Sequence, residues 1–240
     1  MTGFGVFTFH LVEMPVTATV PLLRRPPRLD QVAGLHYAEC LSLMRLGAPT
    51  VSPDRLQLRR LAMFARWDDE SAIDEFLAGS GARFATGWHV RMTFLRRWST
   101  LAALPGLPQQ ADVSDDDEPV VAVTLARMRL PEVPRFLTWG KPVERLVRDH
   151  PEATLALAAM RPPRSISTFS IWHSVRAMTD MVHGRGAAAE VLDPARHADA
   201  MAERRRRDFH REFATYRFRP LSEHGNWDGR TGYVPRRSSL

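Results

Sequence analysis

The sequence has few residues of several types, and each shortage excludes a class of structure. Cys40 is the only cysteine, so no disulfide can form within the chain, and its apolar, helix-like surroundings predict a buried thiol. Lys141 is the only lysine, so arginine supplies nearly all of the positive charge behind the net charge of +6. No stretch approaches the roughly 18 consecutive apolar residues of a transmembrane helix, and the N-terminal residues lack the basic segment of a signal peptide. We therefore expect a cytoplasmic protein without an integral membrane segment.

The chain also lacks most short motifs that carry known chemistry. It has nine histidines, but no His-x-x-x-His pair and no His/Cys cluster with the spacing of metal ligands. A Gly-x-Ser-x-Gly elbow and a Gly-rich phosphate loop are both missing, although a Ser-His-Asp triad assembled from distant residues remains open. The densest basic run, residues 204–207, is flanked by Glu203 and Asp208 and lacks interleaved aromatic residues. This pattern favours a solvated helix face or an anion site over binding of nucleic acid.

A degenerate repeat is the most informative feature that the sequence does contain. Residues 64–77 match residues 169–182 at a constant offset, 172 − 67 = 105, which pairs Trp67 with Trp172. Both segments have the pattern of a strand followed by a helix, so the two tryptophans are predicted to occupy equivalent places. Repeats about a hundred residues apart are whole domains rather than solenoid units. The sequence therefore predicts a duplicated protein.

Each half can be interpreted as a β-α-β-β-α-β unit, the ferredoxin-like arrangement. In the first unit, residues 1–104, an apolar run predicts a helix over residues 32–46. Asp68 or Asp69 is expected to cap a second helix over residues 71–77. Apolar or alternating patterns predict strands over residues 4–12, 58–67 and 88–95.

The second unit, residues 120–240, is predicted to repeat this order with one addition. Strands are expected over residues 120–125, 153–160, 165–172 and 213–219, and helices over residues 131–139 and 143–148. Residues 184–211 form a helical insertion that the first unit lacks, so we look for the chemistry in the second half. Between the units, the prolines and acid run of residues 105–119 resist burial, which predicts an exposed, mobile linker.

His197, within the insertion, is the histidine best placed to act as a ligand. On a helix with about 100° per residue, Met201, Phe209 and Phe213 share one apolar stripe, and His197 lies at its edge beside Arg204. Such a histidine could face a pocket, or it could only cap or pack.

Trp172 has two interpretations as well. It could end a core strand, or it could line a ligand cavity. The remaining histidines of this half are weaker candidates, and His210 is expected on the helix face opposite the stripe: His173, His183 and His210.

Several of these segments together form a recognisable pattern. In the second half they are residues 168–172, Met178, His197 with Met201, the basic run 204–207 and residues 209–218. The first half and the C-terminus add residues 64–77, 88–98 and 224–229. The pattern spans most of residues 56–229 and resembles that of the spheroidene monooxygenase family.

The resemblance implies a dimeric α+β barrel fold and a heme cofactor that is used to insert oxygen into a carotenoid. Carried over by position, His197 matches the family's histidine ahead of its basic segment and becomes the candidate axial ligand of the heme iron. Arg204 becomes a candidate partner of the propionates, and Met201, Phe209 and Trp172 become candidates to line the cofactor site. This chain departs from the pattern at Phe209, where a tryptophan is usual, and in the wider spacing before His197.

The sequence thus predicts an α+β protein whose tandem ferredoxin-like units form a dimeric-α+β-barrel-type architecture within one chain. The expected function is that of a heme-dependent monooxygenase acting on an apolar small molecule. The sequence identifies no electron donor and leaves homo-oligomer formation open. Two alternatives also remain open: a non-catalytic barrel that binds heme or an apolar ligand, and an aldoxime-dehydratase-like heme enzyme.

Overall fold

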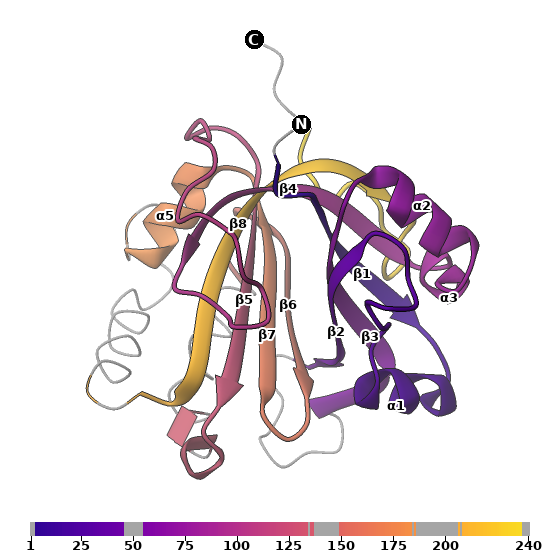
Figure 1. Ribbon diagram of the computed structural model, residues 1–240. Helices are drawn as coiled ribbons and strands as arrows, with labels where there is room; N and C mark the ends of the chain where they lie inside the picture. Colours follow the sequence, from indigo (N-terminus) through magenta and orange to yellow (C-terminus); the bar gives the residue numbers. More distant parts are fainter. Residues whose placement is uncertain are drawn as a thin grey trace.

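The computed structural model describes residues 3–45, 55–133, 135–136, 149–183, 185, 206 and 208–236. Within these residues one sheet closes into a barrel with the strand order β1-β3-β2-β6-β7-β5-β8-β4, and all neighbouring strands are antiparallel (Figure 1). The strands of the first half are β1 (Val6–Glu13), β2 (Leu35–Met44), β3 (Leu56–Trp67) and β4 (Trp88–Trp98). Those of the second half are β5 (Val120–Met128), β6 (Ala153–Arg161), β7 (Ser165–Trp172) and β8 (His210–His224).

Short helices lie on the outside of the barrel (Figure 1). The first half has α1 (Val16–Arg24), α2 (Glu70–Ala78) and α3 (Ala82–Ala85), and the second half has α5 (Val175–Val182) and the 3-10 helix η2 (Leu130–Glu132). In the described part of the chain, none of the helices has the length and apolar character that a membrane span requires. Most of residues 131–148 and most of the predicted insertion lie outside the described residues.

The strand order resolves into two copies of the same sheet. The first unit has the order β4-β1-β3-β2, and the second has the corresponding order β8-β5-β7-β6. The copies join at two seams, β2–β6 and β4–β8, so neither sheet keeps a free edge. The predicted fold, two ferredoxin-like units closed into an α+β barrel within one chain, is confirmed.

The 105-residue repeat is visible in the structure. Trp67 ends β3 and Trp172 ends β7, and both side chains are fully buried. Each pairs with the first residue of the first strand of its unit, Val6 or Val120. The predicted equivalence of the two tryptophans is confirmed.

The helix caps follow the same offset. Asp69 accepts a hydrogen bond from Ala72 N at 3.0 Å at the start of α2, as predicted. At the start of α5, Ser174 accepts one from Ala177 N at 3.0 Å. Since 174 − 69 = 105, the repeat extends through the turn into the helix.

Matching the ladder pairs gives the counterpart positions in the other strands. Val6–Trp67 corresponds to Val120–Trp172, so β1 and β5 differ by 120 − 6 = 114. Leu35–Trp67 corresponds to Ala153–Trp172, so β2 and β6 differ by 153 − 35 = 118. Phe7–Met92 corresponds to Val121–Phe218, so β4 and β8 differ by 218 − 92 = 126.

These offsets reveal a pseudo-two-fold axis that passes through both seams. Ser42 pairs with Met160 across the β2–β6 seam, and 160 − 42 = 118, so each is the counterpart of the other. Thr93 and Arg219 are related in the same way across the β4–β8 seam, since 219 − 93 = 126. Because the paired strands are antiparallel, this axis exchanges the two ends of the barrel.

Side chains that alternate along the strands separate an interior core from two outer cores. The interior cluster includes the aromatic residues Phe7, Phe9, Phe64, Phe94, Phe169 and Phe218. A second cluster packs the first sheet against α1, α2 and α3 around Trp67 and Phe76. A third packs the second sheet against α5 around Trp172 and Met178. The barrel interior is therefore filled by side chains.

The predicted helix over residues 32–46 is wrong, because the described part of this segment forms β2 and the helix of this connection is α1. β2 is buried along most of its length. Its apolar residues therefore form a run without the alternation of a half-exposed strand, and such a run cannot be told from a buried helix. α1 contains Pro21 and several β-branched residues, which lower its helix propensity. Cys40 is buried as predicted, but in a strand, and burial raises the pKa of its thiol.

The last strand of each unit is followed by a segment that covers one end of the barrel. Ser99 and Gly225 are counterparts, since 225 − 99 = 126, and their φ angles are 64° and 75°. This left-handed conformation, which glycine adopts more readily than serine, turns the chain across the barrel end. The residues that then join the interior cluster are Leu101, Leu104 and Leu107 after β4, and Trp227 and Tyr233 after β8.

The segment predicted as an exposed linker, residues 105–119, is therefore not exposed throughout. Leu107 is 4% exposed, and Ala111 N donates a hydrogen bond to Leu95 O at 2.8 Å. The acid run 115–117 is exposed, as its charges require. The boundary between the two units within this segment remains a prediction.

Candidate functional site

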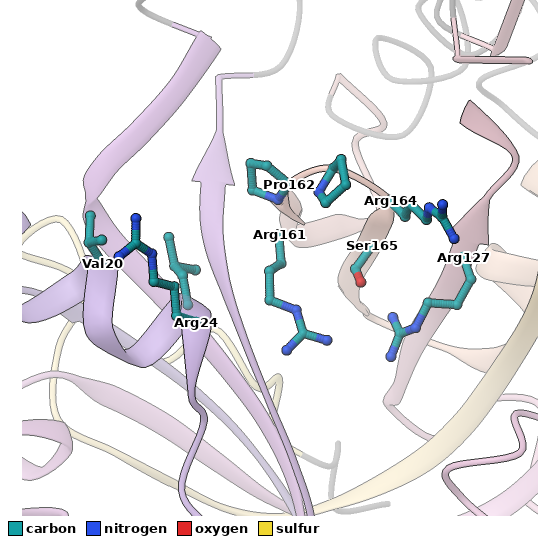
Figure 2. Close-up of a pocket in the computed structure, with 9 residues that line it drawn as sticks. Val20, Arg24, Arg127, Arg161, Pro162, Arg164 and Ser165 are labelled. Atoms are coloured by element: carbon teal, nitrogen blue, oxygen red, sulfur yellow. The ribbon is translucent and has the colours of Figure 1, made fainter. Parts of the chain in front are cut away.

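The seam between β2 and β6 is short. Among the described residues these strands pair only over residues 42–44 and 158–160. Beside this seam, between α1 and the β6–β7 turn, lies a cavity of about 690 Å³, which we call the seam pocket. Its lining residues are Val20, Leu23, Arg24, Arg127, Arg161, Pro162, Pro163, Arg164 and Ser165 (Figure 2).

A buried carboxylate lies next to this pocket. Glu39, on β2, is 1% exposed and accepts hydrogen bonds on Oε2 from Tyr37 Oη at 2.6 Å and from Arg127 Nη2 at 2.5 Å. Arg161 Nη2 lies 3.0 Å from the other carboxylate oxygen. Glu39 therefore holds two guanidinium groups and a phenol in fixed positions.

Burial and charge set the protonation of this cluster. Burial raises the pKa of Tyr37 well above its usual value, and the neighbouring Glu39 charge raises it further. The phenol therefore stays protonated and donates a hydrogen bond to Glu39. Burial lowers the pKa of Arg127, but the hydrogen bond and charge of Glu39 outweigh that effect, and the pKa is raised. The carboxylate stabilises Arg127 as a cation.

Two arginines flank a serine across three neighbouring strands. Arg127 pairs with Ser165 in the β5–β7 ladder, and Ser165 pairs with Arg161 in the β6–β7 ladder. Paired residues lie on the same sheet face with Cβ atoms about 5 Å apart, and Figure 2 shows Arg161 and Arg127 extending toward one space with Ser165 between them. Arg127 Nη1 and Ser167 Oγ are buried without a hydrogen-bond partner in the described part of the chain. Unpartnered buried donors are rare in folded proteins and indicate a missing acceptor.

A second polar row lies on the outer face of the first sheet. His10, His89 and His224 stack across β1, β4 and β8, with ring centroids 4.8 Å and 4.7 Å apart. Burial, and then nearby positive charge, lowers the pKa of all three, that of His89 to about 4. The rings stack face to face, and no group of three or more metal-ligating side chains occurs within the described ranges.

Three of the predicted cofactor residues lie outside the described part of the chain: His197, Met201 and Arg204. The other two, Trp172 and Phe209, lie at opposite ends of β5. Trp172 pairs with Val120 at the start of β5, whereas Phe209 O accepts a hydrogen bond from Arg129 N just beyond its end. Eight residues of strand separate these ends, which corresponds to about 26 Å. Trp172 and Phe209 therefore do not line the same pocket.

Phe209 is buried among aromatic rings. Its ring centroid lies 5.8 Å from that of Phe136, and the Arg135 guanidinium lies 4.1 Å over its face. Phe209 precedes β8 and Phe213 lies within β8, so the predicted helical stripe from His197 to Phe213 is wrong at its C-terminal end. His210, expected on the opposite face, is instead 4% exposed and contacts the same rings.

Trp172 belongs to the outer core beneath α5. Its Nε1 donates a hydrogen bond to Ser170 Oγ at 2.8 Å, and its ring contacts His150 at 4.9 Å between centroids. Of its two interpretations, these contacts match the one in which it ends a core strand. His173 is exposed at the adjoining turn.

Sequence reasoning missed both polar rows. Glu39 is the only carboxylate in the apolar run of β2, and a lone charge in such a run is a signal for a buried, paired group. No comparable signal exists for the histidine row, because His10, His89 and His224 are far apart in the sequence and meet only through strand pairing.

No protein-family model matches the sequence, and no curated protein matches it. Several solved structures are similar to this chain at low sequence identity. An aldoxime dehydratase in complex with butyraldoxime has a TM-score of 0.52 and 7% identity, over 90% of this chain and 79% of that one. A second aldoxime dehydratase has a TM-score of 0.46 and 8% identity, over 90% and 81%. A monooxygenase-like protein from Listeria innocua has a TM-score of 0.29 and 10% identity, over 92% and 98%. The aldoxime dehydratase with a TM-score of 0.52 supports the α+β barrel fold.

Proposed function

We propose that the protein is a heme-dependent monooxygenase that acts on an apolar small molecule. The observation that carries the proposal is the barrel itself, in which two ferredoxin-like units close within one chain. This is the fold that the resemblance to the spheroidene monooxygenase family implies. The fold shared with an aldoxime dehydratase over 90% of the chain supports an enzyme that acts on a small molecule. Fold alone does not fix chemistry, so the test concerns the cofactor.

The described residues do not by themselves form a heme site. No histidine lines the seam pocket, and His10 and His89 are buried in a stack. A heme would therefore be held by His197 as the iron ligand, with Met201 and Arg204. Of the five predicted cofactor residues, Phe209 and Trp172 are described, and both are buried. Trp172, at the other end of β5, would not share that site.

The test is the absorption spectrum of protein expressed with heme supplied. Wild-type protein is expected to show a Soret band, and His197→Ala is expected to lose or shift it, because the iron loses its axial ligand. His173→Ala is the matched control, since His173 is exposed, whereas His210 is buried against Phe209. A wild-type protein that takes up no heme would refute the proposal, and so would an unaltered spectrum of His197→Ala.

A non-catalytic ligand-binding barrel is the second candidate, favoured by the filled interior and by a seam pocket lined with cations and apolar groups. Oxygen consumption by the heme-loaded protein with a reductant separates the two. An aldoxime-dehydratase-like enzyme would instead convert butyraldoxime to a nitrile and water without consuming oxygen.

A further inference from the structure

The seam pocket carries more positive charge than its surroundings neutralise. Among the nine described residues that line it, four are arginines and none carries a carboxylate. Glu39 pairs with Arg127 and Arg161, and among the described residues neither Arg24 nor Arg164 forms an ion pair. The cluster therefore has a net charge of 4 − 1 = +3. A concave site with one sign of charge attracts the opposite sign.

At the other end of the barrel, the counterparts of Arg127 and Ser165 form an ion pair. Pseudo-symmetry places Glu13 at the position of Arg127 (127 − 114 = 13) and Arg60 at the position of Ser165 (165 − 105 = 60). Arg60 Nε donates to Glu13 Oε1 at 2.9 Å, and its Nη2 pairs with Asp228. Glu13 and Arg60 are therefore paired with each other at this end, and the counterpart of Arg161 is Leu43, so the arginines beside Ser165 are not repeated by the symmetry of the fold.

The pocket combines its cations with an apolar wall. Arg127 Nη2 is held by Glu39 while its Nη1 is buried without a partner. A guanidinium fork matches the two oxygens of a carboxylate. Val20 of α1 lies across the pocket from Pro162 (Figure 2), and Leu23 and Pro163 also line it. A ligand with an anionic head and a hydrocarbon body would satisfy both parts.

We propose that the seam pocket binds a small organic carboxylate. Arg127 and Arg161 bind the carboxylate head, Arg164 adds positive charge at the rim of the pocket, and the hydrocarbon body lies between α1 and the two prolines. Glu39 pairs with two of the arginines and offsets one unit of their positive charge. The cavity of about 690 Å³ falls within the roughly 300–1,000 Å³ of small-molecule sites. This site involves described residues only and is separate from the heme site proposed at His197.

Isothermal titration calorimetry of the full-length protein with octanoate tests the proposal. Saturable binding to one site is expected. Arg161→Gln should weaken it about tenfold or more, because it removes a charge-assisted hydrogen bond, and Arg164→Gln should weaken it by less, because it removes a neighbouring positive charge. Arg161→Gln leaves Glu39 bonded to Arg127 and Tyr37, so the fold is retained, which far-ultraviolet circular dichroism checks.

Arg59→Gln is the matched control. Arg59 is the counterpart of Arg164, since 164 − 59 = 105, and it is exposed on β3, so octanoate affinity should not change. Glu39→Gln should bind octanoate several-fold more tightly, because a competing negative charge is removed; a residue with only a structural role would not raise affinity. Octan-1-ol, which lacks the charge, and phosphate, which lacks the body, should each bind at least about tenfold more weakly than octanoate.

Three results would overturn the proposal. Wild-type protein could fail to bind octanoate at millimolar concentration. The Arg161 and Arg164 variants could bind as well as Arg59→Gln. Phosphate could bind as tightly as octanoate, which would exclude a role for the apolar wall. The titration requires no heme, so its outcome is independent of the Soret test of the proposed function.

Discussion

The outer faces of the two sheets present equivalent rows of residues with different chemistry. His10, His89 and His224 cross β1, β4 and β8. Their counterparts, at 10 + 114, 89 + 126 and 224 − 126, are Thr124, Thr215 and Trp98. In that row the two threonine hydroxyls lie 3.2 Å apart and share a hydrogen bond. The histidine row can therefore take up protons as the pH falls, whereas the threonine and tryptophan row cannot.

The inner positions at the two barrel ends differ in the same way. Glu39 and Arg161 have Leu157 (39 + 118) and Leu43 (161 − 118) as counterparts. The backbone pairing is preserved in both units, while the buried polar groups are confined to one position of each pair. In a duplicated chain the strand pairing can thus stay the same while the side-chain chemistry of the two halves diverges.

The largest effect is expected where the two units are most alike. Trp67→Ala and Trp172→Ala each remove a fully buried indole, so each should lower the free energy of unfolding by about 3–5 kcal/mol. Urea denaturation measures both. If only one variant is strongly destabilised, the two units do not contribute equally to the fold.

Arg127 and its counterpart Glu13 should respond very differently to the same replacement. Arg127→Met removes a cation from the buried Glu39 and should cost about 3 kcal/mol of stability. Glu13→Met changes a side chain that is 66% exposed and should cost about 0.5 kcal/mol or less. Thermal or urea unfolding of the pair checks this, and equal losses would mean that the Glu39 cluster does not stabilise the fold.

The histidine row should make stability depend on pH. Its histidines have lowered pKa values in the folded state, so the unfolded state binds protons more readily, and stability is lost as pH falls from about 6.5 toward 4. His10 and His89, which are buried, each contribute up to about 1.4 kcal/mol per pH unit in this window, and the more exposed His224 contributes less. The row is also faced by Arg91, Glu70 and Asp74. Arg91 lowers the pKa of Asp74, so the effect of Asp74 on stability appears below pH 3.8.

Replacing His10 and His89 by threonine, the residue at their counterpart positions, tests whether the histidine row causes the pH dependence of stability. The double variant His10→Thr and His89→Thr should show a flatter dependence of urea midpoint on pH between 6.5 and 4. His36→Thr, which changes an exposed histidine on β2, should keep the wild-type slope. An unchanged slope in the double variant would assign the pH dependence to other groups.

The smallest effect is expected at the helix caps. Asp69→Ala and Ser174→Ala each remove one side-chain hydrogen bond to a helix N-terminus, so each should cost about 1 kcal/mol. Equal losses in urea unfolding would extend the equivalence of the units to their caps. A loss in only one variant would limit the equivalence to the strands.

How far the sequence alone predicts this molecule depends on whether the signal is local. The segment from Trp67 through the Asp69 cap was predictable because strand pattern, capping residue and repeat offset lie within a dozen residues. β2 was not, because burial on both faces removes the alternation that marks a strand. The neighbours of Glu39 were not predictable either, since Arg127 and Arg161 reach it only through the barrel seam.

The two seams have a further consequence for stoichiometry. In a barrel made from two identical chains, every substitution appears twice, so an arginine that creates a binding site at one end creates it at the other. Here both halves belong to one chain, and the second half is held near the first at a high effective concentration by the intervening residues. Each half can therefore change alone. The barrel can thus have a carboxylate site at a single end, with one ligand bound per chain.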